Sequence, residues 1–267
     1  MTQPTPDGSM NKLRVLDLFA GIGGFSLGLE RTGGFETVAF CEIDPFCQKV
    51  LAKHWPGVPI YDDIRNLTSE RLATDGIRVD VITGGFPCQD ISFAGAGAGL
   101  AGERSGLWSE ISRLVGELRS QYLIVENVAA LLGRGLGNVL GDLAEIGYDA
   151  ELHCIPASAV GASQERDRIW IIADSAKERA SRLLTSKNIS EARFGRKGGA
   201  ANLQRLAASP FEPGDSHPQP LIRGVARGIP CLVDRVGACG NSVDPAIPEM
   251  IGRAILQAQH DYTQPAE

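Results

Sequence analysis

Short apolar runs recur along the chain and alternate with amphipathic stretches and turn residues. Runs rich in Val, Ile and Leu predict buried strands at 14–19, 37–41, 80–83, 121–125, 148–154 and 168–173. Apolar residues at helical spacing predict helices at 45–54, 108–118 and 135–146, and a last helix from 245 to about 260. Strands that alternate with helices predict an open α/β fold, which binds its ligands at the carboxyl edge of the sheet.

The first strand runs directly into a glycine-rich turn, residues 20–24, that opens a helix. Such a turn lets the backbone approach a nucleotide-like ligand and points N–H groups outward. The next strand ends at Glu42, where an acid is placed to hold both hydroxyls of a ribose. Asp44 and Pro45 then predict a helix N-cap and first turn. This pattern alone is shared by dehydrogenases and many transferases.

A cysteine follows the strand at 80–83 on a stiff turn. Gly84 and Gly85 end the strand, and Pro87 fixes the backbone beside Cys88. This placement at the sheet edge predicts a nucleophile, although a buried structural cysteine is an open alternative. The next residues, 90–107, contain five glycines and four alanines and predict a mobile loop that could cover the site.

Further polar residues are expected at the same edge. Glu126 directly follows the apolar run at 122–125. Strand alternation places Gln164, Arg166 and Arg168 on one face, where two arginines suit a planar polar or anionic ligand. A surface salt-bridge ladder with neighbouring acids is the alternative. Asp63 follows a short β-like stretch and could meet the base of an adenosine, or could be an ordinary turn residue.

Charge is divided unevenly along the 267 residues, whose net charge is −6. Residues 174–235 carry 11 Lys/Arg against 6 Asp/Glu, while the remainder carries 15 against 26. The basic, loop-rich segment suits a nucleic-acid-facing module on an acidic body, or else a solvated insert. The chain has six cysteines without a C-x-x-C pair and only four histidines, so no zinc site is expected. With no apolar run of about 18 residues and no signal peptide, a cytoplasmic protein is expected, not a membrane protein.

Taken together, these motifs resemble the DNA cytosine-C5 methyltransferases of bacterial or phage type. The resemblance rests on seven short segments in a specific order: 19–24 (Phe-Ala-Gly-Ile-Gly-Gly), 42–44 (Glu-Ile-Asp), 63–64 (Asp-Ile), 85–89 (Gly-Phe-Pro-Cys-Gln), 126–128 (Glu-Asn-Val), 164–168 (Gln-x-Arg-x-Arg) and 240–243 (Gly-Asn-Ser-Val). It implies a Rossmann-like methyltransferase sheet with helices on both faces. It also implies a catalytic domain at 1–173, a small target recognition region at 174–228 and a returning C-terminal segment at 229–267. About 50 residues is short for a recognition domain, and Cys239 stands where a larger aliphatic residue is expected.

The resemblance implies S-adenosylmethionine as methyl donor, S-adenosylhomocysteine as product and no metal. The implied donor site comprises Phe19, Ala20, Gly21, Gly23, Gly24, Glu42, Ile43, Asp63, Ile64, Pro87, Asn241 and Ser242. The implied catalytic residues are Cys88, Glu126, Arg166 and Arg168, and the implied DNA and lid contacts are Gln89, Ser92, Arg104 and Gln164.

The resemblance further implies that the Cys88 thiolate adds to C6 of a flipped-out cytosine, while Glu126 contacts N3 and the amino group and the arginines hold the O2 side. The expected partner is double-stranded DNA, with a restriction endonuclease in the same cell as a further possibility, and a monomer is the family default. Three other functions stay open: transfer RNA as the methylated substrate, a nicotinamide-dependent oxidoreductase, and a non-catalytic nucleic-acid-binding protein.

Overall fold

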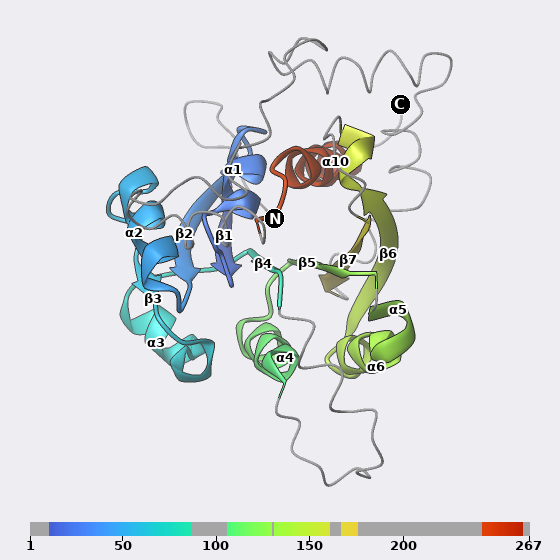
Figure 1. Ribbon diagram of the computed structural model, residues 1–267, viewed down its shortest axis with the longest axis horizontal. Helices are drawn as coiled ribbons and strands as arrows, with labels where there is room; N and C mark the ends of the chain where they lie inside the picture. The colour runs from blue at the N-terminus through green and yellow to red at the C-terminus, as the bar shows by residue number, and fades with distance from the viewer. Residues whose placement is uncertain (1–10, 87–105, 130, 161–166, 176–241, 264–267) are drawn as a thin grey trace, which may run out of the picture.

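The computed structural model describes residues 11–86, 106–129, 131–160, 167–175 and 242–263. Within these residues, seven strands form one sheet in the order β3-β2-β1-β4-β5-β7-β6 (Figure 1). The first five strands are parallel, and β7 runs antiparallel to both of its neighbours. The strands are β1 (Leu13–Leu18), β2 (Phe35–Cys41), β3 (Ile60–Tyr61), β4 (Val81–Gly84), β5 (Tyr122–Val128), β6 (Tyr148–Pro156) and β7 (Asp167–Ser175). The predicted α/β fold is confirmed.

Helices cover both faces of this sheet. On one face lie α1 (Gly24–Glu30) and α10 (Ala246–Thr263); on the other lie α3 (Ser69–Thr74), α4 (Leu107–Leu118) and α6 (Leu136–Glu145) (Figure 1). Helix α2 (Pro45–His54) packs at the β2–β3 end, and the short α5 (Leu131–Arg134) precedes α6. Two 3₁₀ turns, η1 (Ile64–Asn66) and η3 (Ala157–Val160), complete the described elements.

The central strands are mostly apolar because both faces of the sheet are covered. In β5, Leu123 and Val125 pack toward α4 and α6, while Tyr122 and Ile124 pack toward α1 and α10. All four side chains are fully buried. The continuous apolar runs in the sequence therefore reflect a sheet in the middle layer of the molecule.

Strand β5 is longer than the sequence predicts. Its last three residues, Glu126 to Val128, continue the antiparallel ladder with residues 168–170 of β7. The strand therefore extends beyond the apolar run at 121–125, and Glu126 lies near its carboxyl end, as the sequence predicts. The pairing with β7, which polar residues can make as well as apolar ones, explains the extension.

The C-terminal helix returns to the beginning of the chain. A Cβ added to Gly252 of α10 would lie only 2.9 Å from Leu29 and 3.1 Å from Phe35, so α10 packs closely on α1 and the start of β2. The backbone of Pro245 likewise lies against Gly28 of α1. Helix α10 and the residues just before it therefore contact elements from the first part of the chain. The predicted recognition region falls almost entirely on residues 176–241, outside the described residues.

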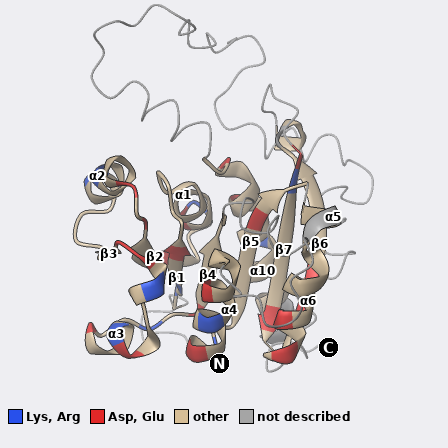
Figure 2. Ribbon diagram, turned by 60° about the horizontal axis from the view of Figure 1, so that its bottom comes forward, with Lys and Arg blue, Asp and Glu red and all other residues tan. Residues whose placement is uncertain are grey.

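Charged residues are interspersed over the described elements. Figure 2 shows Lys and Arg positions mixed with Asp and Glu positions on the helices and strands, with no helix coloured mainly blue. Most of the basic segment at 174–235 falls outside these residues. Within the described residues, none of the helices combines the length and apolar character needed to cross a membrane.

Candidate active site

The candidate site lies along the carboxyl edge of the parallel strands. Strands β1, β2, β4 and β5 point the same way, so their last residues meet at one edge. The glycine turn after β1, Glu42 after β2, the Gly85–Phe86 turn after β4 and Glu126 of β5 all belong to this edge. Four of the segments predicted to carry function are thus brought together by the topology.

The glycine turn after β1 has left-handed backbone conformations. Phe19, Gly21 and Gly23 have φ angles of 52°, 54° and 88°. A Cβ at Gly21 would meet nothing within 4 Å, whereas a Cβ at Gly23 would lie 2.5 Å from the Trp55 ring. Gly23 is therefore required by packing, while Gly21 borders open space that a ligand could fill.

Glu42 is fixed in place by backbone N–H groups. The Gly21 N–H donates to Glu42 Oε2 at 2.7 Å, and the Asp44 N–H donates to Oε1 at 2.8 Å. Only 9% of Glu42 is exposed, whereas the adjacent Ile43 is 65% exposed. Each carboxylate oxygen has a second lone pair, so this carboxylate can still accept hydrogen bonds from a ligand.

Asp63 caps the η1 turn. Its Oδ1 accepts from the Arg65 N–H at 2.9 Å, and its carboxylate forms an ion pair with the Arg65 side chain at 2.7 Å. These hydrogen bonds hold the pKa of Asp63 below its usual value. The side chain of Ile64 is buried in the core, so only its backbone could meet a ligand.

Glu126 and Arg168 form an ion pair across β5 and β7. Arg168 Nε lies 2.6 Å from Glu126 Oε1, and both side chains are largely buried. Glu126 is opposite Trp170 in the ladder, so Arg168 occupies the diagonal position on the same face. On its other side, Glu126 Oε2 is 3.2 Å from the place of a Cβ on Gly85. The carboxylate therefore lies between an arginine and the turn that leads toward Cys88.

Asn127 ties that turn to β5. Its Nδ2 donates to the Phe86 carbonyl oxygen at 3.0 Å, and the side chain is buried.

The remaining predicted site residues lie outside the described residues: Pro87, Cys88, Gln89, Ser92, Arg104, Gln164, Arg166 and Asn241. Of the predicted C-terminal pair only Ser242 is described, and the neighbouring Val243 lies against Gly24.

Asp17 is a buried carboxylate that the sequence prediction missed. It is fully buried and accepts hydrogen bonds from the Ser26 hydroxyl and the Thr83 hydroxyl, both at 2.8 Å. Burial raises the pKa of Asp17 to about 7, and the hydrogen bonds from Ser26 and Thr83 lower it by less. The signal in the sequence is an acid inside an otherwise apolar strand, and such a residue needs buried partners.

Cys41 is excluded as a nucleophile by its surroundings. Burial, followed by the nearby carboxylates of Glu42 and Asp63, raises the pKa of the Cys41 thiol to about 12. It is therefore a neutral thiol at the end of β2.

Among the residues that the structure describes, no group of three or more His, Cys, Asp and Glu side chains could hold a metal ion.

Comparison with known proteins identifies similar sequences. Residues 13–216 match the family described as C-5 cytosine-specific DNA methylase. Type II methyltransferase M2.BsuMI of Bacillus subtilis (strain 168) is 36% identical over 169 residues, which are 60% of this chain and 42% of that protein. Type II methyltransferase M.Bsp6I of Bacillus sp. (strain RFL6) is 37% identical over 166 residues, which are 60% of this chain and 51% of that protein. The chain thus spans about half or less of the length of these relatives.

A solved structure shares the arrangement of the sheet. The crystal structure of a Spodoptera frugiperda DNMT2 mutant superposes with a TM-score of 0.52 at 23% identity, covering 61% of this chain and 50% of that one. At this identity the likeness concerns the fold alone. It agrees with the Rossmann-like methyltransferase sheet expected from the sequence.

Proposed function

Because the chain belongs to the C-5 cytosine-specific DNA methylase family, we propose that it transfers a methyl group from S-adenosylmethionine to carbon 5 of a cytosine in double-stranded DNA. The observation that carries this proposal is the Glu126–Arg168 ion pair beside the Gly85–Phe86 turn. Cys88 follows Phe86 by two residues, which span at most about 7 Å of chain. Chain connectivity therefore allows the proposed nucleophile to meet this carboxylate and guanidinium.

The proposed donor site is the glycine turn with Glu42 and Asp63. The open space beside Gly21 gives room for the donor next to a carboxylate held by two N–H groups. Glu42 would accept from the ribose hydroxyls, Asp63 from the adenine amino group, and the exposed Ile43 would cover the base. Phe19, Ala20, Gly23 and Gly24 would form the turn itself, with Ile64 and Pro87 beside it and Asn241 and Ser242 closing the site. S-adenosylmethionine supplies an electrophilic methyl group and leaves as S-adenosylhomocysteine.

The chain's own residues activate the cytosine. The Cys88 thiolate forms a bond to C6, which moves electron density to C5 and makes that carbon nucleophilic. Glu126 contacts N3 and the amino group and offsets the charge that develops on the ring. Arg168 orients Glu126 and, with Arg166, holds the O2 side. After C5 is methylated, its proton leaves to a base, the C6–S bond breaks and the thiolate of Cys88 is restored.

The substrate must be presented outside the duplex. C5 and C6 of a stacked cytosine are inaccessible to such a site while the base is inside the duplex, so the base has to be flipped out. Gln89, Ser92, Arg104 and Gln164 are proposed to contact DNA around it. As part of the same proposal, the protein acts on DNA as a monomer in the cytoplasm, and a restriction endonuclease in the same cell is its partner.

The test is transfer of a labelled methyl group from S-adenosylmethionine to unmethylated duplex DNA, with transfer RNA assayed in parallel. We expect label at carbon 5 of cytosine in DNA. Cys88→Ala should abolish transfer, and Glu126→Gln should slow it by about 10²–10⁴-fold, the range for a lost general acid–base group.

The matched control is Cys154→Ala, which removes an exposed thiol on β6 and should leave the rate unchanged. Label in RNA alone would assign a different substrate and contradict the proposal. Full transfer by the Cys88→Ala protein would contradict the covalent mechanism.

A further inference from the structure

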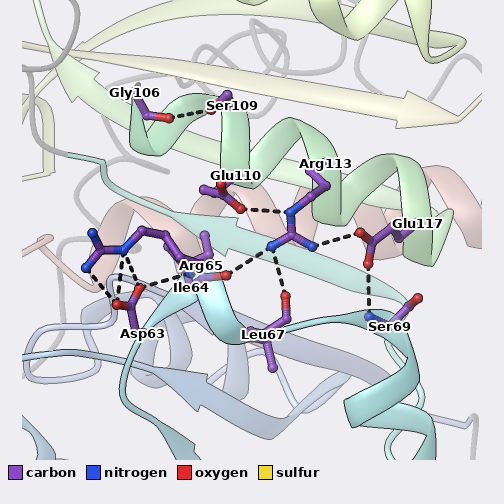
Figure 3. A network of polar contacts seen from close by, with 10 residues as sticks. All are labelled: Asp63, Ile64, Arg65, Leu67, Ser69, Gly106, Ser109, Glu110, Arg113 and Glu117. Atoms are coloured by element: carbon purple, nitrogen blue, oxygen red, sulfur yellow. Dashed lines mark hydrogen bonds and ion pairs between the residues drawn. The ribbon is translucent and has the colours of Figure 1, made fainter. Parts of the chain in front are cut away.

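Arg113 of α4 joins that helix to the turn that carries Asp63 (Figure 3). Its Nη2 donates to the carbonyl oxygens of Ile64 and Leu67, at 3.0 Å and 2.9 Å. Its Nε and Nη1 donate to Glu110 and Glu117 of the same helix, at 2.7 Å and 2.8 Å. The guanidinium is thus held by its own helix and directed at the backbone of η1.

A second contact of the same cluster holds the next residues. Glu117 Oε2 accepts from the Ser69 N–H at 3.0 Å, at the start of α3 (Figure 3). Helix α4 therefore binds the backbone of segment 64–69 at three points. An ordinary exposed ion pair contributes little to stability, but here both charged groups also satisfy backbone groups outside their own helix.

The geometry connects Arg113 to the Asp63 carboxylate through one peptide. The carbonyl of the Ile64–Arg65 peptide accepts from Arg113, and the N–H of the same peptide donates to Asp63 Oδ1 at 2.9 Å. Because a peptide is planar, holding its carbonyl also fixes the direction of its N–H. Rotation of this peptide would break both hydrogen bonds together.

We propose that Arg113 is a positioning residue for the adenine end of the methyl-donor site, acting through the Ile64–Arg65 peptide on the carboxylate of Asp63. The proposal rests on the proposed function, in which Asp63 accepts from the adenine amino group. Helix α4 also packs on the turn that leads to Cys88, because the Trp108 and Phe86 rings are 5.5 Å apart. Arg113 thus joins the adenine side of the site to the helix that supports the catalytic turn.

Lysine cannot replace this arginine. The guanidinium presents five N–H donors in a planar fork and reaches four acceptors at once, whereas an ammonium is a point charge with three donors. Arg113→Lys should therefore keep the charge beside Glu110 and Glu117 but lose the simultaneous hold on the two carbonyls. It separates the electrostatic contribution of the residue from its positioning role.

The test is calorimetric titration of the full chain with S-adenosylhomocysteine and with S-inosylhomocysteine, which carries an oxygen in place of the adenine amino group. We expect Arg113→Met to weaken S-adenosylhomocysteine binding about tenfold, the effect of losing one charge-assisted hydrogen bond. The ratio of its affinities for S-adenosylhomocysteine and S-inosylhomocysteine should fall toward one. Only the adenine compound has an amino group for Asp63, so only its binding depends on how Asp63 is placed. In methyl transfer, KM for the donor should rise with kcat unchanged at saturation. Arg113→Lys should lie between wild type and Arg113→Met.

Two further variants make the result decisive. Arg253→Met removes an exposed arginine that pairs with Glu249 within α10, and it should bind both compounds as wild type does. Asp63→Leu, which has no hydrogen-bond acceptor, should lose the preference for adenine by itself. If it keeps that preference, the role of Asp63 in the proposed function is wrong and so is this inference.

If Asp63→Leu loses the preference while Arg113→Met or Arg113→Lys keeps it, the inference alone is overturned. If the Arg113 variants bind both compounds more weakly by the same factor, the inference is also overturned, because Arg113 would then support the site as a whole. If Arg113→Met does not fold, Arg113→Lys decides between these outcomes.

Discussion

Asp17 is held by groups from two other elements, and these hydrogen bonds explain how a carboxyl group can be buried inside the sheet. Its oxygens accept from Ser26 at the start of α1 and from Thr83 in β4. Thr83 is its direct neighbour in the parallel ladder. One carboxylate therefore joins the helix after the glycine turn to the strand that leads to Cys88.

We predict that Asp17 makes the folded state less stable as the pH rises. Burial raises its pKa from 3.8 to about 7, so between these values the unfolded chain loses the proton while the folded chain keeps it. The contribution of Asp17 to the free energy of unfolding is therefore highest below about pH 4, falls as the pH rises to 7 and is constant above that. The full difference is about 4 kcal/mol, at 1.36 kcal/mol per pKa unit.

Urea unfolding of wild type and Asp17→Asn between pH 5 and pH 8 measures this effect. The asparagine does not ionise, so its stability relative to wild type should increase with pH across this range. Thr83→Val removes a hydrogen bond that favours the carboxylate, and it should move the loss of stability to higher pH. Parallel pH profiles for wild type and Asp17→Asn would show that Asp17 does not titrate in this window.

At the scale of elements, α1 and α10 pack through glycines. A Cβ at Gly252 would come within 3.1 Å of Leu29, Phe35 and Thr32, whereas a Cβ at Gly141 in α6 would meet nothing within 4 Å. We predict that Gly252→Ala destabilises the fold by about 1–3 kcal/mol through overpacking. Gly141→Ala should stabilise it by about 0.5–1 kcal/mol, because alanine has the higher helix propensity.

Thermal or urea unfolding of the two variants compares the same substitution in two helices. Opposite signs are expected, since backbone propensity favours alanine at both sites and only Gly252 is enclosed by neighbours. Stabilisation by both substitutions would show that Leu29 and Phe35 move aside easily, and that the contact between α1 and α10 is loosely packed.

Most elements were predictable because their signals are local. The apolar runs identified β1, β2, β4, β5, β6 and β7, and Asp44 with Pro45 marked the start of α2, where Asp44 accepts from two backbone N–H groups. The short α3 and α5, with six and four residues, were not predicted because they are too short to show helical periodicity. The apolar run at 121–125 stops three residues before the end of β5, because those last residues pair with the partner strand and are polar in part.

The candidate site was predictable only in part, because only some of its residues have a local signal in the sequence. Glu42 and Asp63 follow recognisable strands and Glu126 lies near the end of one, so their place at the sheet edge could be inferred. Arg113 gave no such signal, because it looks like any charged residue on an amphipathic helix and its carbonyl partners lie 46 and 49 residues away in the sequence. Contacts of this kind depend on the tertiary fold.

For the whole molecule, the proposed donor site joins the beginning of the chain to its end. Gly24, the first residue of α1, lies against the backbone of Val243, and α10 begins three residues later. Helix α10 in turn covers Leu29 and Phe35 near the start of the chain. A ligand that orders the glycine turn should therefore also stabilise α10, although α10 lies on a face of the sheet and not at the proposed site.

We predict that S-adenosylhomocysteine at about 100 times its Kd stabilises the fold by about 2.7 kcal/mol, which raises Tm by about 5–10 °C for a chain of this length. Hydrogen exchange measured by mass spectrometry should slow in α1 and η1, and also in α10. Glu42→Gln, which weakens the hold on the ribose and on the Gly21 N–H, should lose both effects. A rise in Tm without protection of α10 would mean that the ligand stabilises the sheet edge alone. The two ends of the chain would then unfold independently of the site, as locally cooperative units do.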